Sequence, residues 1–332
     1  MQIIVIKLGA AGDVLRTLPL MRAIRDAHAG AEVTLITKEE IVELVKGIDY
    51  IHHIKTIPLR ERLEADILYN FDTDAIALEI ATHTPAKKKY GFYALDGYPA
   101  ACNAGAEYYL NTIFDDELKK KNTLTYQEMM FAAAELPVTK EVYHLPIGDR
   151  AKEYAQRFVE SRISGRGPLI GIHMGASSRW PSKVWSLSYV EEFIKKASAQ
   201  GYEVILFGGP NEINEHGLLS KKLTSEGIPF ARNNPSNSKQ EFLALLEKCD
   251  AFICSDSFAL HAAVGLQKKV LALFFCTSPN ELESYGLVKK IVSPRLYEFF
   301  PEKSDVFDKG LVESISVEQV LTELKNLVPP KV

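Results

Sequence analysis

The sequence predicts an α/β protein of two domains, each a parallel β-sheet flanked by helices. A chain of 332 residues is too long for one ordinary hydrophobic core. Short apolar strands alternate with helical patterns in both halves, and this alternation requires parallel strands joined by right-handed crossovers. We place the domains at residues 1–148 and 149–310, and we expect residues 311–332 to form a helix that packs back on the first domain.

The first half opens with a strand at residues 3–7, a glycine loop and a helix at residues 13–28. Apolar residues at helical spacing support this helix, and Pro19 inside the pattern predicts a kink or a late helix start. The remaining predicted elements are strands at 32–36, 50–54 and 66–71, a short helix at 41–45 and a helix at 126–135.

Pro146 and Gly148 mark a linker to the second half, which repeats the βαβ pattern. Its predicted strands are residues 169–173, 203–207, 252–254, 270–274 and 290–292. Its predicted helices are residues 151–161, 188–199, 213–224, 239–248, 258–264 and 317–327.

Composition narrows the class of protein. Apolar residues make up 46% of the chain and charged residues 25%, as in soluble globular proteins. The net charge of −4 argues against a general nucleic-acid binder. The cysteines form no Cys-x-x-Cys pair, so neither a zinc site nor a disulfide framework is indicated and we expect a reducing compartment. The N-terminus is typical of a strand rather than a signal peptide, and no apolar run has membrane-spanning length.

Two lysine runs, residues 87–89 and 119–121, depart from this balance. They fit either a solvated face or contact with an anionic acceptor or an acidic membrane surface.

Polar residues follow two strands of the second half. Lys183 comes after the strand at 169–173 and a Gly-Ala-Ser-Ser turn that contains Ser177, whereas Asp256, Ser257 and His261 follow the strand at 252–254. Open α/β sheets bind ligands at the carboxyl ends of strands. A lysine, small hydroxyl residues and a helix N-terminus there suit a nucleotide diphosphate. Asp256 or Ser257 could instead cap the helix, and His261 could be structural.

Asp13 has two interpretations. It could be the N-cap of the first helix, or a general base kept ionised by the helix N-terminus. Gly9 and Gly12 before it allow a tight turn and close backbone approach, which makes Gly12 a binding candidate. The Gly-x-Gly-x-x-Gly fingerprint is absent, so a nicotinamide cofactor is not indicated.

Glu212 ends the Gly-Gly-Pro-Asn-Glu turn and could hold ribose hydroxyls or merely start a helix. Trp180 and Trp185 are assigned to packing rather than base stacking. No Asp-x-Asp pair indicates a metal clamp, so we expect no bound metal.

Together these segments resemble the ADP-heptose:lipopolysaccharide heptosyltransferases, glycosyltransferase family 9, of GT-B fold. The matching stretches are KLGAAGDVLRTLP from Lys7, GASSRWPSKVW from Gly175, GGPNE from Gly208, SDSFALHAA from Ser255 and LFFCTSP from Leu273. They occur in the family's order. Phe258 stands where the family usually has glycine.

The resemblance implies two facing Rossmann-like domains and inverting transfer of a heptose or related sugar. Asp13 would be the base, and Lys183, Glu212 and the segment from Asp256 to His261 would hold an ADP-sugar, which is a co-substrate rather than a cofactor. The acceptor would be an anionic, lipid-linked, lipopolysaccharide-core-like saccharide, used in the cytoplasm with peripheral contact at the inner membrane. Two alternatives stay open: a GT-B epimerase or hydrolase of a nucleotide sugar, and a non-catalytic nucleotide-sugar-binding protein, which Phe258 motivates.

Overall fold

The computed structural model describes residues 1–175, 177 and 179–330, and the chain divides into two compact units. Ala176 and Ser178, which belong to the loop singled out above, lie outside the described residues. The first unit comprises Met1–Pro146 with Asn280–Glu283, and the second comprises Ile147–Pro279 and the chain from Ser284 onward.

The first unit contains a six-stranded sheet of order β3-β2-β1-β4-β5-β6. The strands are β1 (Gln2–Ile6), β2 (Glu32–Thr37), β3 (His53–Thr56), β4 (Ala65–Asn70), β5 (Ala86–Leu95) and β6 (Tyr98–Ala101). All are parallel except β6, which forms an antiparallel hairpin with β5. Because the strand order reverses between β1 and β4, a ligand-binding crevice is expected at the carboxyl ends of these two strands.

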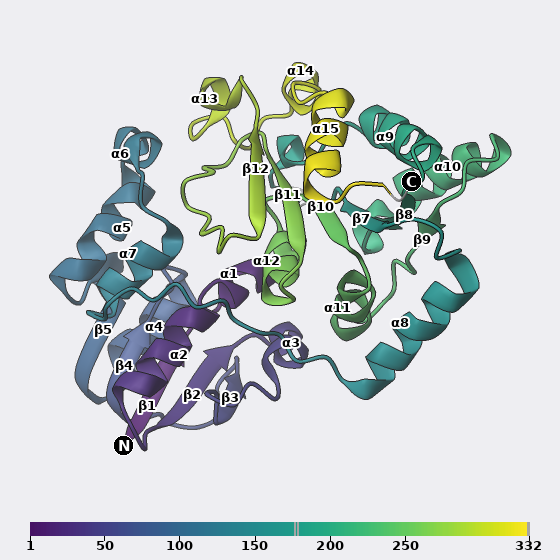
Figure 1. Cartoon of the computed structure of the whole chain (residues 1–332). Helices are drawn as coiled ribbons and strands as arrows, with labels where there is room; N and C mark the ends of the chain where they lie inside the picture. Colours follow the sequence, from purple (N-terminus) through teal and green to yellow (C-terminus); the bar gives the residue numbers. More distant parts are fainter. Residues whose placement is uncertain (176, 178, 331–332) are drawn as a thin grey trace. The chain divides into compact units, whose positions relative to one another are not determined.

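Seven α-helices surround this sheet in the described chain (Figure 1). They are α1 (Ala11–Leu15), α2 (Leu18–Ala27), α3 (Val42–Val45), α4 (Ala75–His83), α5 (Ala104–Phe114), α6 (Asp116–Lys121) and α7 (Tyr126–Ala133). The predicted helix at 13–28 is therefore two helices, and Pro19 occupies the first turn of α2. Proline fits there because the first amides of a helix need no intrahelical acceptor, so the interruption predicted from Pro19 takes the form of a second helix start.

The second unit also contains a six-stranded sheet, of order β12-β11-β10-β7-β8-β9 and parallel throughout. The strands are β7 (Leu169–His173), β8 (Glu203–Phe207), β9 (Ala231–Arg232), β10 (Ala251–Ser255), β11 (Lys269–Phe274) and β12 (Val288–Val292). Here the order reverses between β7 and β10. These are the two strands that precede Lys183 and Asp256 in the sequence.

Helices cover both faces of this second sheet (Figure 1). They are α8 (Asp149–Arg162), α9 (Leu187–Ala199), α10 (Ile213–Ser225), α11 (Lys239–Glu247), α12 (Phe258–Gly265), α13 (Leu296–Phe299), α14 (Lys309–Val312) and α15 (Val317–Leu327). Trp185 is fully buried in the core beside α9, and its indole Nε1 donates to the carbonyl of Ile315 at 2.9 Å. This tryptophan therefore packs its loop onto the sheet, as predicted.

The C-terminal helix has its contacts within the second unit. There α15 packs on α9 and β11. Its apolar stripe joins the core of that unit, and this burial explains the placement: Val317, Val320, Leu321 and Leu324. The segment that does join the first unit is Asn280–Glu283, where the amide of Tyr126 donates to the carbonyl of Glu281 at 2.9 Å.

Among the described residues, no helix combines the length and the apolar character needed to cross a bilayer.

Candidate active site

In the first unit, a buried ion pair lies at the strand-order reversal. Lys7 follows β1 and Asp72 follows β4, and their Nζ and Oδ2 atoms are 3.4 Å apart. Lys7 Nζ also donates to the carbonyl of Phe71 at 2.6 Å, and Asp72 Oδ2 accepts from the amide of Leu8 at 3.0 Å. This network fixes the start of the glycine loop that leads to Asp13.

Asp13 is the third residue of α1, so the N-cap interpretation is wrong. The N-cap position belongs to Ala10, which has extended backbone and no side-chain oxygen. The helix begins at Ala11, directly after the tight glycine turn and two residues before Asp13, where the sequence predicted its start. The carboxylate therefore lies in the first helical turn, where the helix N-terminus favours its ionised form. Gly12 is buried inside the same helix, in a different unit from the other donor-binding candidates.

Arg16 contacts Asp13 from the end of α1. Its Nη2 lies 2.7 Å from Asp13 Oδ1, and its guanidinium carbon lies 3.7 Å from the ring centroid of Tyr126. Burial works to lower the pKa of Arg16, but the charges around it, Asp13 first and then Tyr126, Tyr109 and Glu281, together outweigh burial and hold that pKa above its ordinary value. Sequence patterns gave no reason to single out Arg16 or Tyr126.

In the second unit, the structure brings together three predicted donor-binding residues. Lys183 ends a short 3₁₀ turn (Pro181–Lys183), and its Nζ lies 3.4 Å from Asp256 Oδ2. His261 Nε2 lies 4.0 Å from Asp256 Oδ1. Lys183 is only 17% exposed and Asp256 24%, so the pair is shielded from most of the solvent. A half-buried lysine beside a helix start suits a phosphate group.

Ser257 occupies the N-cap position of α12 but makes no side-chain cap bond. Its buried Oγ has no hydrogen-bond partner among the described residues, and the same holds for Ser255 Oγ and Thr277 Oγ1. The capping role considered for Ser257 is therefore not realised. Buried hydroxyls without partners, next to a helix start with unsatisfied amides, are suited to accept a ligand's oxygens. Thr277 was not singled out in the sequence, although it lies three residues after the end of β11.

Glu212 lies against the loop after β7. Its Oε2 accepts from the amide of Gly209 at 2.7 Å. A Cβ at Gly175 would lie 2.9 Å from Glu212 Oε1, so the absence of a side chain there lets the two loops meet. Asn233 holds the loop after β8, which contains Glu212. Its side chain accepts from the amide of Gly208 at 2.9 Å and donates to the carbonyl of Gly208 at 3.1 Å.

Two buried histidines lie under these loops. Burial, assisted by His216, lowers the pKa of His173 to about 4. Burial and the nearby charge of Arg232 lower the pKa of His216 to about 4. Both imidazoles are therefore neutral at physiological pH.

The structure does not bring Ser177 into this group. Its side chain is exposed, and its Oγ accepts from the amide of Arg179 at 3.3 Å.

Phe258 packs on a helix of its own unit. Its ring centroid lies 5.7 Å from that of Phe242 on α11, which in turn contacts Phe207 at 5.2 Å. This aromatic packing holds the bulky side chain of Phe258 at the start of α12.

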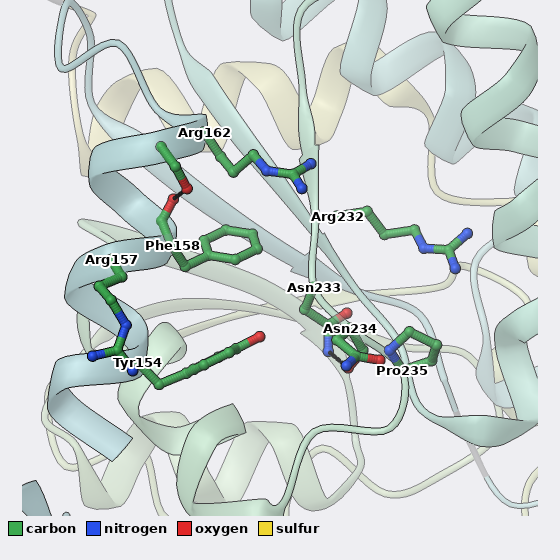
Figure 2. A pocket seen from close by; sticks show the side chains of 9 residues that line it. Tyr154, Arg157, Phe158, Arg162, Arg232, Asn233, Asn234 and Pro235 are labelled. Atoms are coloured by element: carbon green, nitrogen blue, oxygen red, sulfur yellow. Dashed lines mark hydrogen bonds between the residues drawn. The ribbon is translucent and has the colours of Figure 1, made fainter. Parts of the chain in front are cut away.

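A pocket of about 440 Å³ lies elsewhere on the second unit, between α8 and the segment after β9. Figure 2 shows Tyr154, Phe158 and Arg162 pointing from α8 toward Asn234 and Pro235. No predicted site residue lines it.

The described part of the chain holds no group of three His, Cys, Asp or Glu side chains arranged to bind a metal. Burial raises the pKa of the Cys276 thiol to about 11, which keeps it in the neutral form.

The lysine runs serve partly as structural contacts. Lys89 Nζ donates to the carbonyls of Ala81 and Thr82 at the end of α4, at 2.7 and 2.9 Å. Lys87 pairs with Asp66, and Lys121 pairs with Glu117.

Comparison with known proteins gives the same family that the sequence motifs resemble. The profile of glycosyltransferase family 9 (heptosyltransferase) matches residues 63–305. Lipopolysaccharide heptosyltransferase 2 of Salmonella typhimurium is 29% identical over 170 residues, which span 50% of this chain and 48% of that protein. The chain thus matches about half the length of this curated relative.

Solved structures show the same fold. A family 9 glycosyl transferase from Veillonella parvula has a TM-score of 0.74 at 18% identity, with 98% of this chain and 96% of that chain covered. The E. coli ADP-heptose lps heptosyltransferase II has a TM-score of 0.70 at 18% identity, with 98% of both chains covered. The predicted GT-B fold, with two parallel-sheet α/β units, is thereby confirmed. Since the family profile covers well over half of its residues, the chain belongs to glycosyltransferase family 9, the heptosyltransferase family.

Proposed function

We propose that the chain transfers a heptose or a related sugar from an ADP-sugar to a hydroxyl of a lipopolysaccharide-core-like saccharide, with inversion. The observation that carries this proposal is the arrangement at the start of α12: Lys183 paired with Asp256, beside buried hydroxyls that have no partner among the described residues. Family membership and the ADP-heptose named for a solved relative support the choice of donor.

In this mechanism the second unit holds the donor. Lys183 and the first amides of α12 neutralise the negative charge that develops on the diphosphate as its bond to the sugar breaks. Glu212 accepts hydrogen bonds from ribose hydroxyls, and Asp256 orients the Lys183 ammonium. ADP leaves with the bonding electron pair.

The first unit supplies the base. An acceptor hydroxyl attacks the anomeric carbon from the side opposite the diphosphate, so the new carbon–oxygen bond forms as the old one breaks. Asp13 takes the hydroxyl proton, and a positioned carboxylate contributes about 10²–10⁴-fold to such a transfer. No metal is required for any of these steps, because lysine and helix amides supply the positive charge.

We further propose that the acceptor is anionic and lipid-linked and that the enzyme works in the cytoplasm with peripheral contact at the inner membrane. The lysines of α6 and exposed Phe114 next to them support such a contact. Binding to anionic vesicles but not neutral ones would test it.

The test of the function itself combines binding and turnover. ADP at 100 times its dissociation constant should stabilise the protein by about 2.7 kcal/mol, and UDP and GDP should do so less at equal concentration. ADP-heptose with a core saccharide acceptor should then release ADP and glycosylated product in equal amounts. Free heptose without acceptor would favour the hydrolase alternative, and tight ADP-sugar binding without turnover on any acceptor would favour the binding-protein alternative.

A further inference from the structure

Arg16 lies one helical turn from Asp13, and the two side chains form a close ion pair. Arg16 Nη2 and Asp13 Oδ1 are 2.7 Å apart, and the side chains are 19% and 35% exposed. Fully exposed ion pairs contribute little to stability. Partial burial makes this contact stronger, because less water screens it.

Tyr126 holds the guanidinium in place. The ring of this fully buried tyrosine lies 3.7 Å below the Arg16 guanidinium carbon, a close cation–π contact. Tyr126 Oη lies 3.2 Å from Thr17 Oγ1, and Thr17 Oγ1 donates to the carbonyl of Asp13 at 2.7 Å. The same tyrosine therefore supports both Arg16 and the backbone of Asp13.

The backbone of Arg16 is held from the same helix. Gln127 Nε2 donates to the carbonyl of Arg16 at 3.2 Å, where α1 ends. Arg16 is thus fixed at its side chain and at its main chain by adjacent residues of α7.

The geometry does not maximise the hydrogen bonds of Arg16. Its Nε is buried and has no acceptor among the described residues. Leaving a buried donor without a partner costs about 1–3 kcal/mol. An apolar side chain in place of Arg16, packed on the ring of Tyr126, would avoid that cost. The orientation of the guanidinium is therefore set by the carboxylate of Asp13 and the ring of Tyr126.

We propose that Arg16 is a positioning residue for Asp13, which keeps the carboxylate ionised and in one orientation for proton transfer from the acceptor hydroxyl. This inference rests on the proposed function, in which Asp13 is the base. Charged and titratable groups near this pair include Lys7, Tyr109, Tyr126 and Glu281. Lys7 also brings a positive charge near Asp13, but Asp72 is its own partner at 3.4 Å.

The test compares Arg16→Met, Arg16→Lys and a control, Arg22→Met, across a range of pH with saturating donor and acceptor. Arg22 is 46% exposed and pairs with Asp26 and Glu141 on the surface. We expect Arg16→Met to lower kcat at least 10-fold and to move the acid limb of kcat upward by about 1–3 pH units, with KM for the ADP-sugar unchanged. Arg16→Lys should recover part of both, because it keeps the charge without the planar stack. Arg22→Met should resemble the parent.

A second pair of variants covers the case in which Arg16→Met does not fold. Tyr126→Leu removes the ring and should shift the acid limb in the same direction, whereas Tyr126→Phe keeps the ring and should shift it less. An unmoved acid limb in a folded Arg16→Met or Tyr126→Leu protein would overturn the positioning role. If Asp13→Asn retains turnover, the proposed function itself fails; if Asp13→Asn is inactive and Arg16→Met behaves as the parent, only the role of Arg16 fails.

Discussion

A Cβ atom at Gly9 would lie 2.9 Å from Cβ and 3.1 Å from Oδ2 of Asp13. Real Cβ atoms almost never approach so closely, and Asp13 Cβ belongs to a helix that cannot move away cheaply. Gly9 therefore leaves the space in which the Asp13 carboxylate lies. The glycine is required here by close approach, and not by an unusual backbone angle.

Replacing Gly9 with alanine should displace the carboxylate of Asp13. A shift of about 1 Å in a reacting group can cost about 10²-fold in rate, so we expect kcat to fall by about that factor while ADP affinity stays unchanged. The control is Gly217→Ala in α10, where a new Cβ meets only Arg232 Nη1 at 3.8 Å. That change should leave kcat unchanged and raise stability by up to about 1 kcal/mol. A Gly9→Ala enzyme with parental kcat would show that Asp13 does not depend on this space.

Asp13→Asn tests the base directly. Because Ala10 is the N-cap, neither Asn nor Ala at position 13 removes a cap. Both variants lose the partly buried ion pair with Arg16, so we expect the two to lose stability by similar amounts, about 1–3 kcal/mol each. Turnover should drop by about 10²–10⁴-fold in both, since neither side chain accepts a proton, while the melting temperature rise with ADP persists. An Asp13→Asn enzyme that keeps most of its turnover would contradict the assignment of Asp13 as the general base.

The fold was largely predictable because the buried strands are apolar runs and the helices carry apolar residues at helical spacing. The region 72–125 was not. In β5 the run Lys87–Lys88–Lys89 masks the strand, and Pro99 argues against β6. Both belong to a hairpin at the sheet edge, where polar residues and proline are tolerated. A signal did exist: Asp96 and Gly97 form a two-residue turn with φ of 50° and 82°, the Asp-Gly hairpin pattern.

The candidate site was predictable where one strand end supplies one polar residue, as with Lys183 and Asp256. Lys7 and Asp72 follow the same rule, but their pairing depends on the neighbouring positions of β1 and β4 in the sheet. Arg16 and Tyr126 could not be joined from sequence. They are separated by more than a hundred residues, and only the packing of α7 beside α1 brings the ring under the guanidinium.

Acid should destabilise the second unit through His173 and His216. Both have a folded pKa of about 4, below the ordinary 6.5, because burial disfavours the charged form. The unfolded chain binds these protons first, so the stabilising contribution is complete above about pH 6.5 and is lost as the pH falls toward 4. By pH 5 the loss should be on the order of 2 kcal/mol per histidine. His173→Asn should flatten the dependence of melting temperature on pH between 6.5 and 5; an unchanged slope would contradict the buried neutral state.

Turnover should survive removal of divalent metal ions. The reason is the proposed neutralisation of the diphosphate by Lys183 and the amides of α12, which needs no bridging cation. Initial rates after treatment with EDTA should match those of untreated enzyme. Complete loss of activity that magnesium or manganese restores would require a metal-assisted mechanism instead.

Lys183→Ala should weaken binding of the diphosphate rather than binding of the nucleoside. The variant removes a charge-assisted contact of roughly 1.5–3 kcal/mol, so ADP affinity should fall by about 10- to 150-fold while adenosine affinity changes little. Loss of the lysine also leaves Asp256, its partner at 3.4 Å, as a carboxylate facing the phosphates, which adds to the discrimination. The matched control is Lys222→Ala on α10, which removes an exposed pair with Glu191 on the same unit. Calorimetric titration of each variant with ADP and with adenosine measures both affinities. If ADP and adenosine affinities fall together in Lys183→Ala, the lysine supports the fold of its loop and the phosphate contact must be assigned elsewhere.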